Sequence, residues 1–403
     1  MTSTMTTASG VLKRIYGDYV SKQQNLSHKA IDEIAKSAKK YNAGGEGFFG
    51  AINDSGNEAV GAINETESFR TADDESYQQF KISPKVLTGP VRFSGLLAKA
   101  ADQDEESFVS AVVDLLDMTK ERLLKDMNRQ FFGQGTGLLA KPGGTVSSSA
   151  TSFSVDSAQY LRKNMVVDIF NGATKTVDSY RIQDVDKQNN VVYFSVQLSV
   201  PIVATDEIVK ENVRDSAATD GKEMMGLNGM VDDATLLTTF QNISATANRI
   251  WRAIRIDASS ANLTSDIMQR LDDDILTLGG ESADTYIMHP KQRRKYLDIV
   301  VPEKRFQDLK LDAGFSKLSF NGKELWLDID CQDSIVYMIK KSLIEKYEVA
   351  PLALGSHDGS DNFLRIAGSD QFEAYWRCYM NFGTPKRNAH GKIVSLAKPN
   401  GIS

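Results

Sequence analysis

The sequence of 403 residues is poor in cysteine and histidine, and each shortage excludes a kind of protein. Cys331 and Cys378 are the only cysteines, so a disulfide framework is excluded and a reducing compartment fits best. None of the four histidines lies at metal-ligand spacing from another; they are His28, His289, His357 and His390. No window approaches the roughly 18 uncharged apolar residues that span a bilayer, and the N-terminus lacks the pattern of a signal peptide. We therefore expect no metal, no membrane contact and a cytoplasmic product.

The sequence has fewer basic residues than acidic ones, 47 against 53, and this difference is relevant to nucleic-acid binding. The formal net charge is −6, and the charged residues, 25% of the chain, are spread along it. A protein that wraps nucleic acid needs a basic stripe that displaces phosphate counterions, so direct wrapping of DNA is not expected. With 41% apolar residues the chain can build a core of useful size, and its length favours two domains, or one domain with insertions.

The sequence contains none of the catalytic motifs G-x-S-x-G, H-E-x-x-H and C-x-x-C. The glycine-rich run Gly133–Gly137 follows a predicted helix and does not precede one, so it is interpreted as a helix end and not as a phosphate loop. Asp328, Asp330 and Asp333 fit no calcium-loop spacing and are interpreted as a solvated strand edge. We predict no catalytic residue and no cofactor. Paired catalytic carboxylates leave no motif, so an enzyme on an unrelated α+β fold stays an alternative.

Hydrophobic periodicity divides the chain into six parts. They are a polar N-terminal arm (1–45), an extended hairpin (46–98), a region around a long helix (99–143), an inserted β domain (144–214), a mixed region (215–340), and closing strands with a basic tail (341–403). An amphipathic helix is predicted in the arm at about 27–41. The inserted strands are separated by the turn signals Asn171-Gly172 and Asn189-Asn190. This mixture predicts an α+β fold.

The strongest helix is predicted from about Asp104 to Phe132. Acidic residues in its first turn suit the helix dipole, and its length corresponds to a rod of roughly 40 Å. Its predicted apolar face consists of Phe108, Val112, Leu116, Leu123 and Met127. Lys120 and Lys125 are placed on other faces, where substitution by alanine is expected to change stability little.

The predicted hairpin has few apolar residues to bury against itself. Isolated two-stranded ribbons are marginal in water, so we expect the hairpin to pack on a neighbouring copy of the chain. The residues expected at that contact are Phe69, Arg70, Phe80, Lys81 and Arg92.

The order of these parts resembles that of the tailed-phage major capsid proteins of the Hong Kong 97-like fold. Six stretches carry the resemblance through their order and spacing: Val91–Leu97, Phe131–Gly137, Met225–Val231, Tyr286–Pro290, Glu373–Tyr379 and Pro385–Ile393. The resemblance implies that 99–143 holds the spine helix and peripheral domain, 215–340 the axial domain, and 341–403 the closing peripheral strands and tail. The chain departs from the family in two ways: only some members carry a β insertion, and the long N-terminal scaffold helix of some members is missing.

The resemblance implies a structural protein that self-assembles into the pentamers and hexamers of an icosahedral shell around a double-stranded DNA genome. It also implies a separate scaffolding protein, a portal, a possible decoration protein, and only loose, non-specific contact with DNA at the inner surface. Such a protein resides in the virion, and in the host cytoplasm during assembly. The alternative within this fold is an encapsulin-like shell of a cellular nanocompartment.

Overall fold

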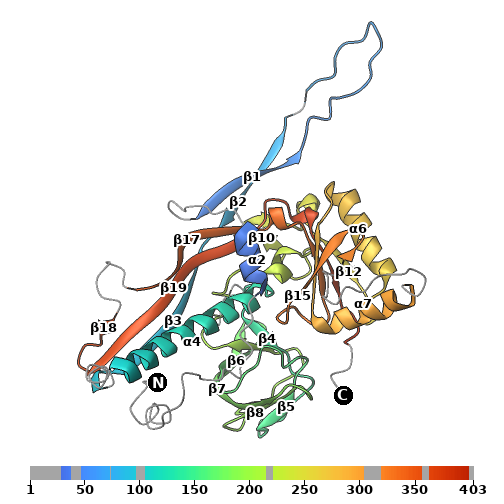
Figure 1. Ribbon diagram of the computed structural model, residues 1–403. Helices are drawn as coiled ribbons and strands as arrows, with labels where there is room; N and C mark the ends of the chain where they lie inside the picture. Colours follow the sequence, from blue (N-terminus) through green and yellow to red (C-terminus); the bar gives the residue numbers. More distant parts are fainter. Residues whose placement is uncertain are drawn as a thin grey trace, which may run out of the picture.

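The computed structural model describes residues 29–37, 47–72, 74–96, 105–214, 221–303, 319–355 and 363–398. These residues form a long arm, a central body with a mixed sheet, and a small β domain below them, while a narrow hairpin projects from the top (Figure 1). None of the described helices is both long and apolar enough to cross a membrane.

The arm is a sheet of long strands backed by one helix. Its elements are β3 (Lys85–Ser94), α4 (Glu105–Phe131), β17 (Glu345–Leu354), β18 (Leu364–Arg365) and β19 (Gln371–Gly383). Strand β19 pairs antiparallel with β3 on one side and with β17 and β18 on the other. Buried and exposed residues alternate along β3, because successive side chains of a strand point to opposite faces. The buried face, which includes Leu87 and Val91, packs toward α4 (Figure 1).

The central body is built on a six-stranded mixed sheet in the order β12-β20-β16-β13-β15-β14. Its elements are β12 (Ile254–Asp257), α6 (Ser265–Gly279), β13 (Thr285–Met288), α7 (Pro290–Glu303), β14 (Ser319–Phe320), β15 (Lys323–Leu327), β16 (Val336–Ile339) and β20 (Gly391–Val394). Alternate residues of β13 face two cores: Tyr286 and Met288 pack with α6, and Ile287 packs with the residues around the end of α4. The predicted region 341–403 therefore contributes to two parts of the fold. Its strand β20 pairs with β12 and β16 of this central sheet and does not join the sheet of β3, β17 and β19.

The β domain is a six-stranded antiparallel sheet with its own apolar core. Its strands are β4 (Leu138–Ala140), β5 (Ser152–Ser154), β6 (Val166–Asn171), β7 (Thr174–Asp186), β8 (Val191–Phe194) and β9 (Glu207–Lys210). Strand β4 pairs with β9, so the sheet begins six residues before the predicted start at 144. Gly172, in the turn between β6 and β7, has a φ of 59°, which glycine adopts without strain.

Short elements connect these parts. They are α2 (Lys29–Ser37), β1 (Phe48–Ser55), β2 (Ser76–Ile82), α5 (Leu227–Met230), β10 (Thr239–Phe240), β11 (Ile243–Ser244) and the 3₁₀ turns η1 (Arg249–Trp251), η3 (Lys341–Leu343) and η4 (Arg387–Ala389). Helix α2 packs against α4 and η3, and its Ala30, Ile31 and Ile34 join the main apolar core.

Candidate assembly surface

The root of the projecting hairpin is fixed to the body. Strands β1 and β2 pair from Phe48 with Ile82 to Ser55 with Ser76. Phe48, Phe80 and Ile82 are buried in the main core, and the ring centroid of Phe48 lies 5.0 Å from that of Tyr347. The base of the hairpin is therefore part of the folded subunit.

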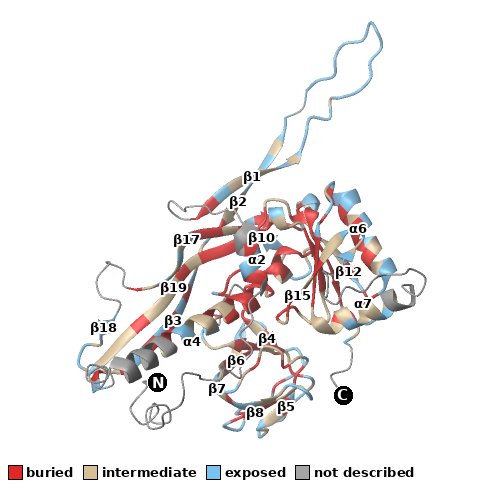
Figure 2. Cartoon of the chain, in the orientation of Figure 1, coloured by how far each residue is buried: buried red, intermediate tan, exposed pale blue. Residues whose placement is uncertain are grey.

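The hairpin tip, residues 56–75, has no comparable support. No residue described within it is buried, and Phe69 and Val60 are 90% and 86% exposed. The tip extends away from the body along its whole length (Figures 1 and 2). Residues 53–75 contain seven carboxylates and one arginine. Large exposed apolar side chains on a projecting loop mark an interaction surface, and the flanking carboxylates favour a partner surface with basic residues at its rim.

Local hydrogen bonds shape the tip without burying it. The backbone N–H and the side-chain amide of Asn64 both donate to the carboxylate of Glu67, at 2.9 Å and 2.7 Å. The backbone hydrogen bond from Asn64 and then the side-chain one lower the pKa of Glu67. A side chain at Gly61 would collide with the guanidinium of Arg70, so the two sides of the tip touch there. The tip therefore presents Phe69 on a defined loop.

The five predicted contact residues fall in three places. Phe69 and Arg70 lie in the tip, and Phe80 and Lys81 lie on β2 near the root. Arg92 lies on β3, outside the hairpin, where its Nε is 3.1 Å from Glu373 on β19. The predicted hairpin of 46–98 is thus too long, because its last third pairs with β19 near the other end of the chain.

The helix α4 carries the predicted apolar face, of which Leu116, Leu123 and Met127 are buried. The structure describes the backbone at Phe108 and Val112 but not the placement of their side chains. The Nζ of Lys120 lies 5.1 Å above the ring of Trp376. The expectation that Lys125 tolerates alanine is wrong, because this side chain is only 3% exposed and its Nζ lies 2.6 Å from Oδ2 of Asp330.

This lysine belongs to a buried polar cluster, here called the acid junction, whose carboxylates are Asp328, Asp330 and Asp333. All three are buried, so their interpretation as a solvated strand edge is wrong. Asn128 of α4 donates to Asp328 at 3.1 Å and to Asp330 at 2.7 Å. The backbone N–H of Ala30 in α2 donates to Asp328 at 3.1 Å. Burial raises the pKa of Asp328.

The acid junction also holds the β domain and the C-terminal segment. Tyr160 donates its hydroxyl to the carbonyl of Asp330 at 2.6 Å, and Gln159 donates to the carbonyl of Cys331 at 2.9 Å. Asp333 forms ion pairs with Lys291 and Lys398, at 3.1 Å and 3.6 Å. Asp330 and Asp333 are paired with lysines, whereas Asp328 accepts hydrogen bonds from neutral groups. No group of three or more possible ligands among the described residues is arranged to hold a metal ion. The junction is a structural contact between parts distant in sequence.

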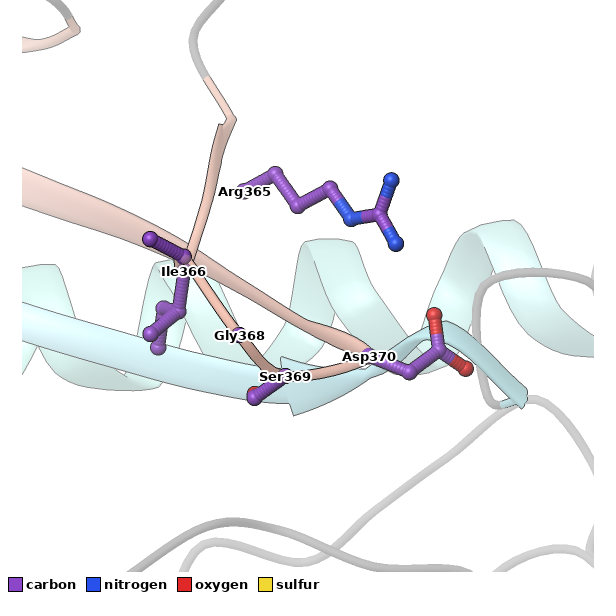
Figure 3. A pocket seen from close by; sticks show the side chains of 6 residues that line it. Arg365, Ile366, Gly368, Ser369 and Asp370 are labelled. Carbon is purple, nitrogen blue, oxygen red and sulfur yellow. The ribbon is translucent and has the colours of Figure 1, made fainter.

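A hollow of about 480 Å³ lies at the turn between β18 and β19 and is lined by residues 365–370. Figure 3 shows that Arg365 and Asp370 contribute its charged side chains. The lining contains one serine, Ser369, but no histidine or lysine that could act as its base. The backbone N–H of Gly95 donates to the carbonyl of Asp370 at 2.8 Å, so this turn closes the end of β3.

Comparison with known proteins gives likeness in fold alone. No family model matches the chain, and no curated protein matches it in sequence. The chain is similar to a protein of the cyanophage A-1(L) capsid asymmetric unit, with a TM-score of 0.59 at 10% identity over 95% of this chain and 97% of that one. It is also similar to the capsid of the native GTA particle, with a TM-score of 0.53 at 8% identity over 95% and 96% of the two chains. For the capsid of Myoviridae phage XM1 the TM-score is 0.50 at 11% identity over 95% and 97%.

These matches span 95% of the chain. The chain is therefore a mixed α/β protein with the fold of shell subunits. More particularly, this is the fold of phage capsid proteins.

Proposed function

We propose that the chain is the major capsid protein of a tailed phage or a related particle, with the Hong Kong 97-like arrangement of N-terminal arm, hairpin, spine helix, peripheral and axial domains. In this proposal α4 is the spine helix, the β3–β19–β17 sheet belongs to the peripheral domain, the central body is the axial domain, and the β domain is an insertion. Copies of the chain form the pentamers and hexamers of an icosahedral shell around double-stranded DNA. A scaffolding protein, a portal and a possible decoration protein are its expected partners.

The observation that carries the proposal is the hairpin tip on a body with a capsid-protein fold. The root is buried in the subunit, while Phe69 and Val60 are almost fully exposed. Exposing such side chains forfeits about 1.5–3 kcal/mol each relative to burial, and a symmetric assembly recovers this by placing every tip on a neighbouring copy. This supports a structural function over an enzymatic one.

Replacement of residues 56–72 by a short Gly-Ser turn tests the proposal. The variant should keep the circular dichroism and thermal unfolding of the unassembled subunit, because no buried residue is removed. It should form no shells in negative-stain micrographs under conditions in which the parent chain assembles. The matched control is Ala173→Ser in the exposed turn between β6 and β7 of the β domain, which should still assemble. Normal shells from the tip variant would contradict the proposed role of the hairpin.

The contents of the shells separate the two functions that this fold suggests. Shells from the natural source should contain nuclease-protected double-stranded DNA if the chain encloses a genome. Protein cargo in place of DNA would favour the nanocompartment alternative.

A further inference from the structure

The β domain meets the central body and α4 along a seam in which several basic side chains lack acidic partners. Two loops of the β domain lie there, residues 155–165 between β5 and β6 and residues 187–190 between β7 and β8. The first loop reaches the acid junction through Gln159. The Nζ of Lys187, in the second loop, is 3.4 Å from the carbonyl oxygen of Gln159. The two loops therefore present one surface toward the rest of the subunit.

Arg162 is the central residue of this seam. It lies in the first loop and is half-buried, yet its guanidinium makes no hydrogen bond or ion pair within the part of the chain that the structure describes. A guanidinium keeps its proton in proteins, so Arg162 cannot avoid the cost of a partly buried charge by becoming neutral. Arg122 of α4, which is exposed, also has no partner among the described residues.

The carboxylates whose charges act on Arg162 already have cations of their own. They are Asp126 of α4 and Asp330 of the acid junction. Asp126 is 3.1 Å from Nε of Arg129, and Asp330 is 2.6 Å from Nζ of Lys125. Neither carboxylate is therefore left over to neutralise Arg162.

The electrostatic environment of the seam agrees with this shortage of acidic groups. Burial lowers the pKa of Arg162; the two carboxylates oppose this shift, and the charges of Arg129 and Arg122 add to it. The pKa of Lys187 is also lowered, by partial burial of its ammonium group and then by the charge of Arg162. Unpaired positive charge is thus shared between α4 and the two loops of the β domain.

We propose that this seam binds a phosphate group between α4 and the β domain, with Arg162 as its main ligand and Arg122 and Lys187 beside it. A guanidinium presents two parallel N–H groups to two phosphate oxygens. A phosphate monoester carries roughly two negative charges at neutral pH and offers three oxygens, so it matches several cations better than a carboxylate does. The bound anion fastens the β domain to the spine helix, because it pairs with cations of both.

The site belongs to the single chain, so binding can be measured on the unassembled subunit whether or not shells form. A subunit that assembles but does not bind phosphate would contradict only this proposal. A subunit that binds phosphate but never assembles would contradict only the proposed function.

Calorimetric titration and thermal unfolding of the unassembled subunit with inorganic phosphate test the proposal. Ionic strength is held constant with sodium chloride, because salt alone screens exposed charges. Phosphate should bind in a saturable way and raise the unfolding temperature, since a ligand that binds only the folded chain stabilises it; acetate should do so much less. Arg162→Gln should weaken phosphate binding about tenfold or more. Lys187→Gln and Arg122→Gln should weaken it to a smaller extent.

The matched control is Lys163→Gln, which removes the same charge from an exposed neighbour in the same loop and should keep the affinity of the parent chain. Equal phosphate binding by Arg162→Gln and the parent, or stabilisation by phosphate no greater than that by chloride, overturns the proposal. If Arg162→Gln does not fold, the exposed positions decide: phosphate affinities of Lys187→Gln and Arg122→Gln equal to that of Lys163→Gln also overturn it.

A short DNA duplex identifies the source of the phosphate group. A duplex that binds the parent, is displaced by inorganic phosphate and does not bind Arg162→Gln supports the site and assigns it to the nucleic-acid backbone. A duplex that does not bind, while inorganic phosphate does, supports the site and assigns it to a free phosphate compound.

Discussion

The hairpin tip consists of extended chain and turns, and the β domain consists of antiparallel strands joined by tight turns. Only the β domain has an apolar core. In the β domain Ile169, Ile182 and Val192 are completely buried, and the apolar faces of six strands close on one another. In the tip no described residue is buried. A strand pair is stable in water only where one face is removed from solvent. The strands of the β domain are buried against one another within the chain, whereas the tip can be buried only against another molecule.

The two regions also differ in how they are attached. The β domain is joined to the central body through Gln159 and Tyr160 at the acid junction, whereas the hairpin is held at its root by Phe48, Phe80 and Ile82. Substitutions in the β domain or at its attachment should therefore change the stability of one subunit. Substitutions in the tip should change only what the subunit does with its neighbours.

Lys125→Ala should have the largest effect, because it removes the cation that contacts Asp330 at the attachment of the β domain. Breaking a buried ion pair typically costs about 3–5 kcal/mol, and urea unfolding of the unassembled subunit measures the loss. The matched control is Lys163→Ala in the β domain; Lys163 is exposed, so its removal should change stability by less than about 0.5 kcal/mol. Equal losses in the two variants would mean that the junction does not hold these parts together.

A pair of alanine substitutions tests the comparison directly. Ile169→Ala leaves a cavity in the β domain and should cost about 2–5 kcal/mol of unfolding free energy. Phe69→Ala in the tip should change that free energy by less than about 0.5 kcal/mol and yet reduce assembly, as followed by light scattering. A Phe69→Ala subunit that is clearly destabilised would show that the tip packs on its own chain.

The spine helix offers the same contrast within one element. Leu123 is 7% exposed, so Leu123→Ala should cost about 2–5 kcal/mol in thermal unfolding of the unassembled subunit. The Nζ of Lys120 lies over the ring of Trp376, and Lys120→Ala should cost about 0.5–1 kcal/mol. Similar losses of unfolding free energy at both positions would show that the buried face of α4 has been assigned to the wrong residues.

Lowering the pH from 6.5 to 5 should change the stability of the central body through its histidines. Neither the tip nor the β domain contains a histidine, so this effect should be absent from both regions. Burial lowers the pKa of His390 in the central body from 6.5 to about 3, so below pH 6.5 the unfolded chain binds a proton that the folded chain does not. Stability should therefore fall between pH 6.5 and 5, by up to about 1.4 kcal/mol per pH unit. Calorimetry should show the transition of the central body moving down while that of the β domain stays in place. Burial also lowers the pKa of His289 to about 4, so His289 contributes a similar slope over this range. His390→Gln should therefore remove about half of the combined dependence, and an unchanged slope would exclude His390 as a source.

Local signals in the sequence predicted the helices well. The long helix was expected from Asp104 to Phe132 and runs from Glu105 to Phe131. The helix α6 begins where Thr264 accepts a hydrogen bond from the N–H of Ile267 and ends at Gly280, whose φ is 65°. Periodicity and caps involve residues within a few positions of one another, so the sequence displays them directly.

Contacts between distant residues could not be predicted in the same way. Lys125 and Asp330 are 205 positions apart, and a sequence shows that each is charged but not that they meet. The three junction aspartates look like a solvated edge because their partners come from α2, α4, α7 and the C-terminal segment. Strand β3 was assigned to the hairpin because its alternation is clear, whereas its pairing with β19 is visible only in three dimensions.

The pairing of β3 with β19 also sets the order in which the subunit is completed during synthesis. Residues 85–94 and the helix that packs on them leave the ribosome long before residues 371–383, which form the strand between β3 and β17. Until then β3 has a free hydrogen-bonding edge, a state that invites pairing with other chains. A chain that stops before residue 371 carries the hairpin but lacks the arm. Only full-length translation products can therefore present the tip on a finished subunit.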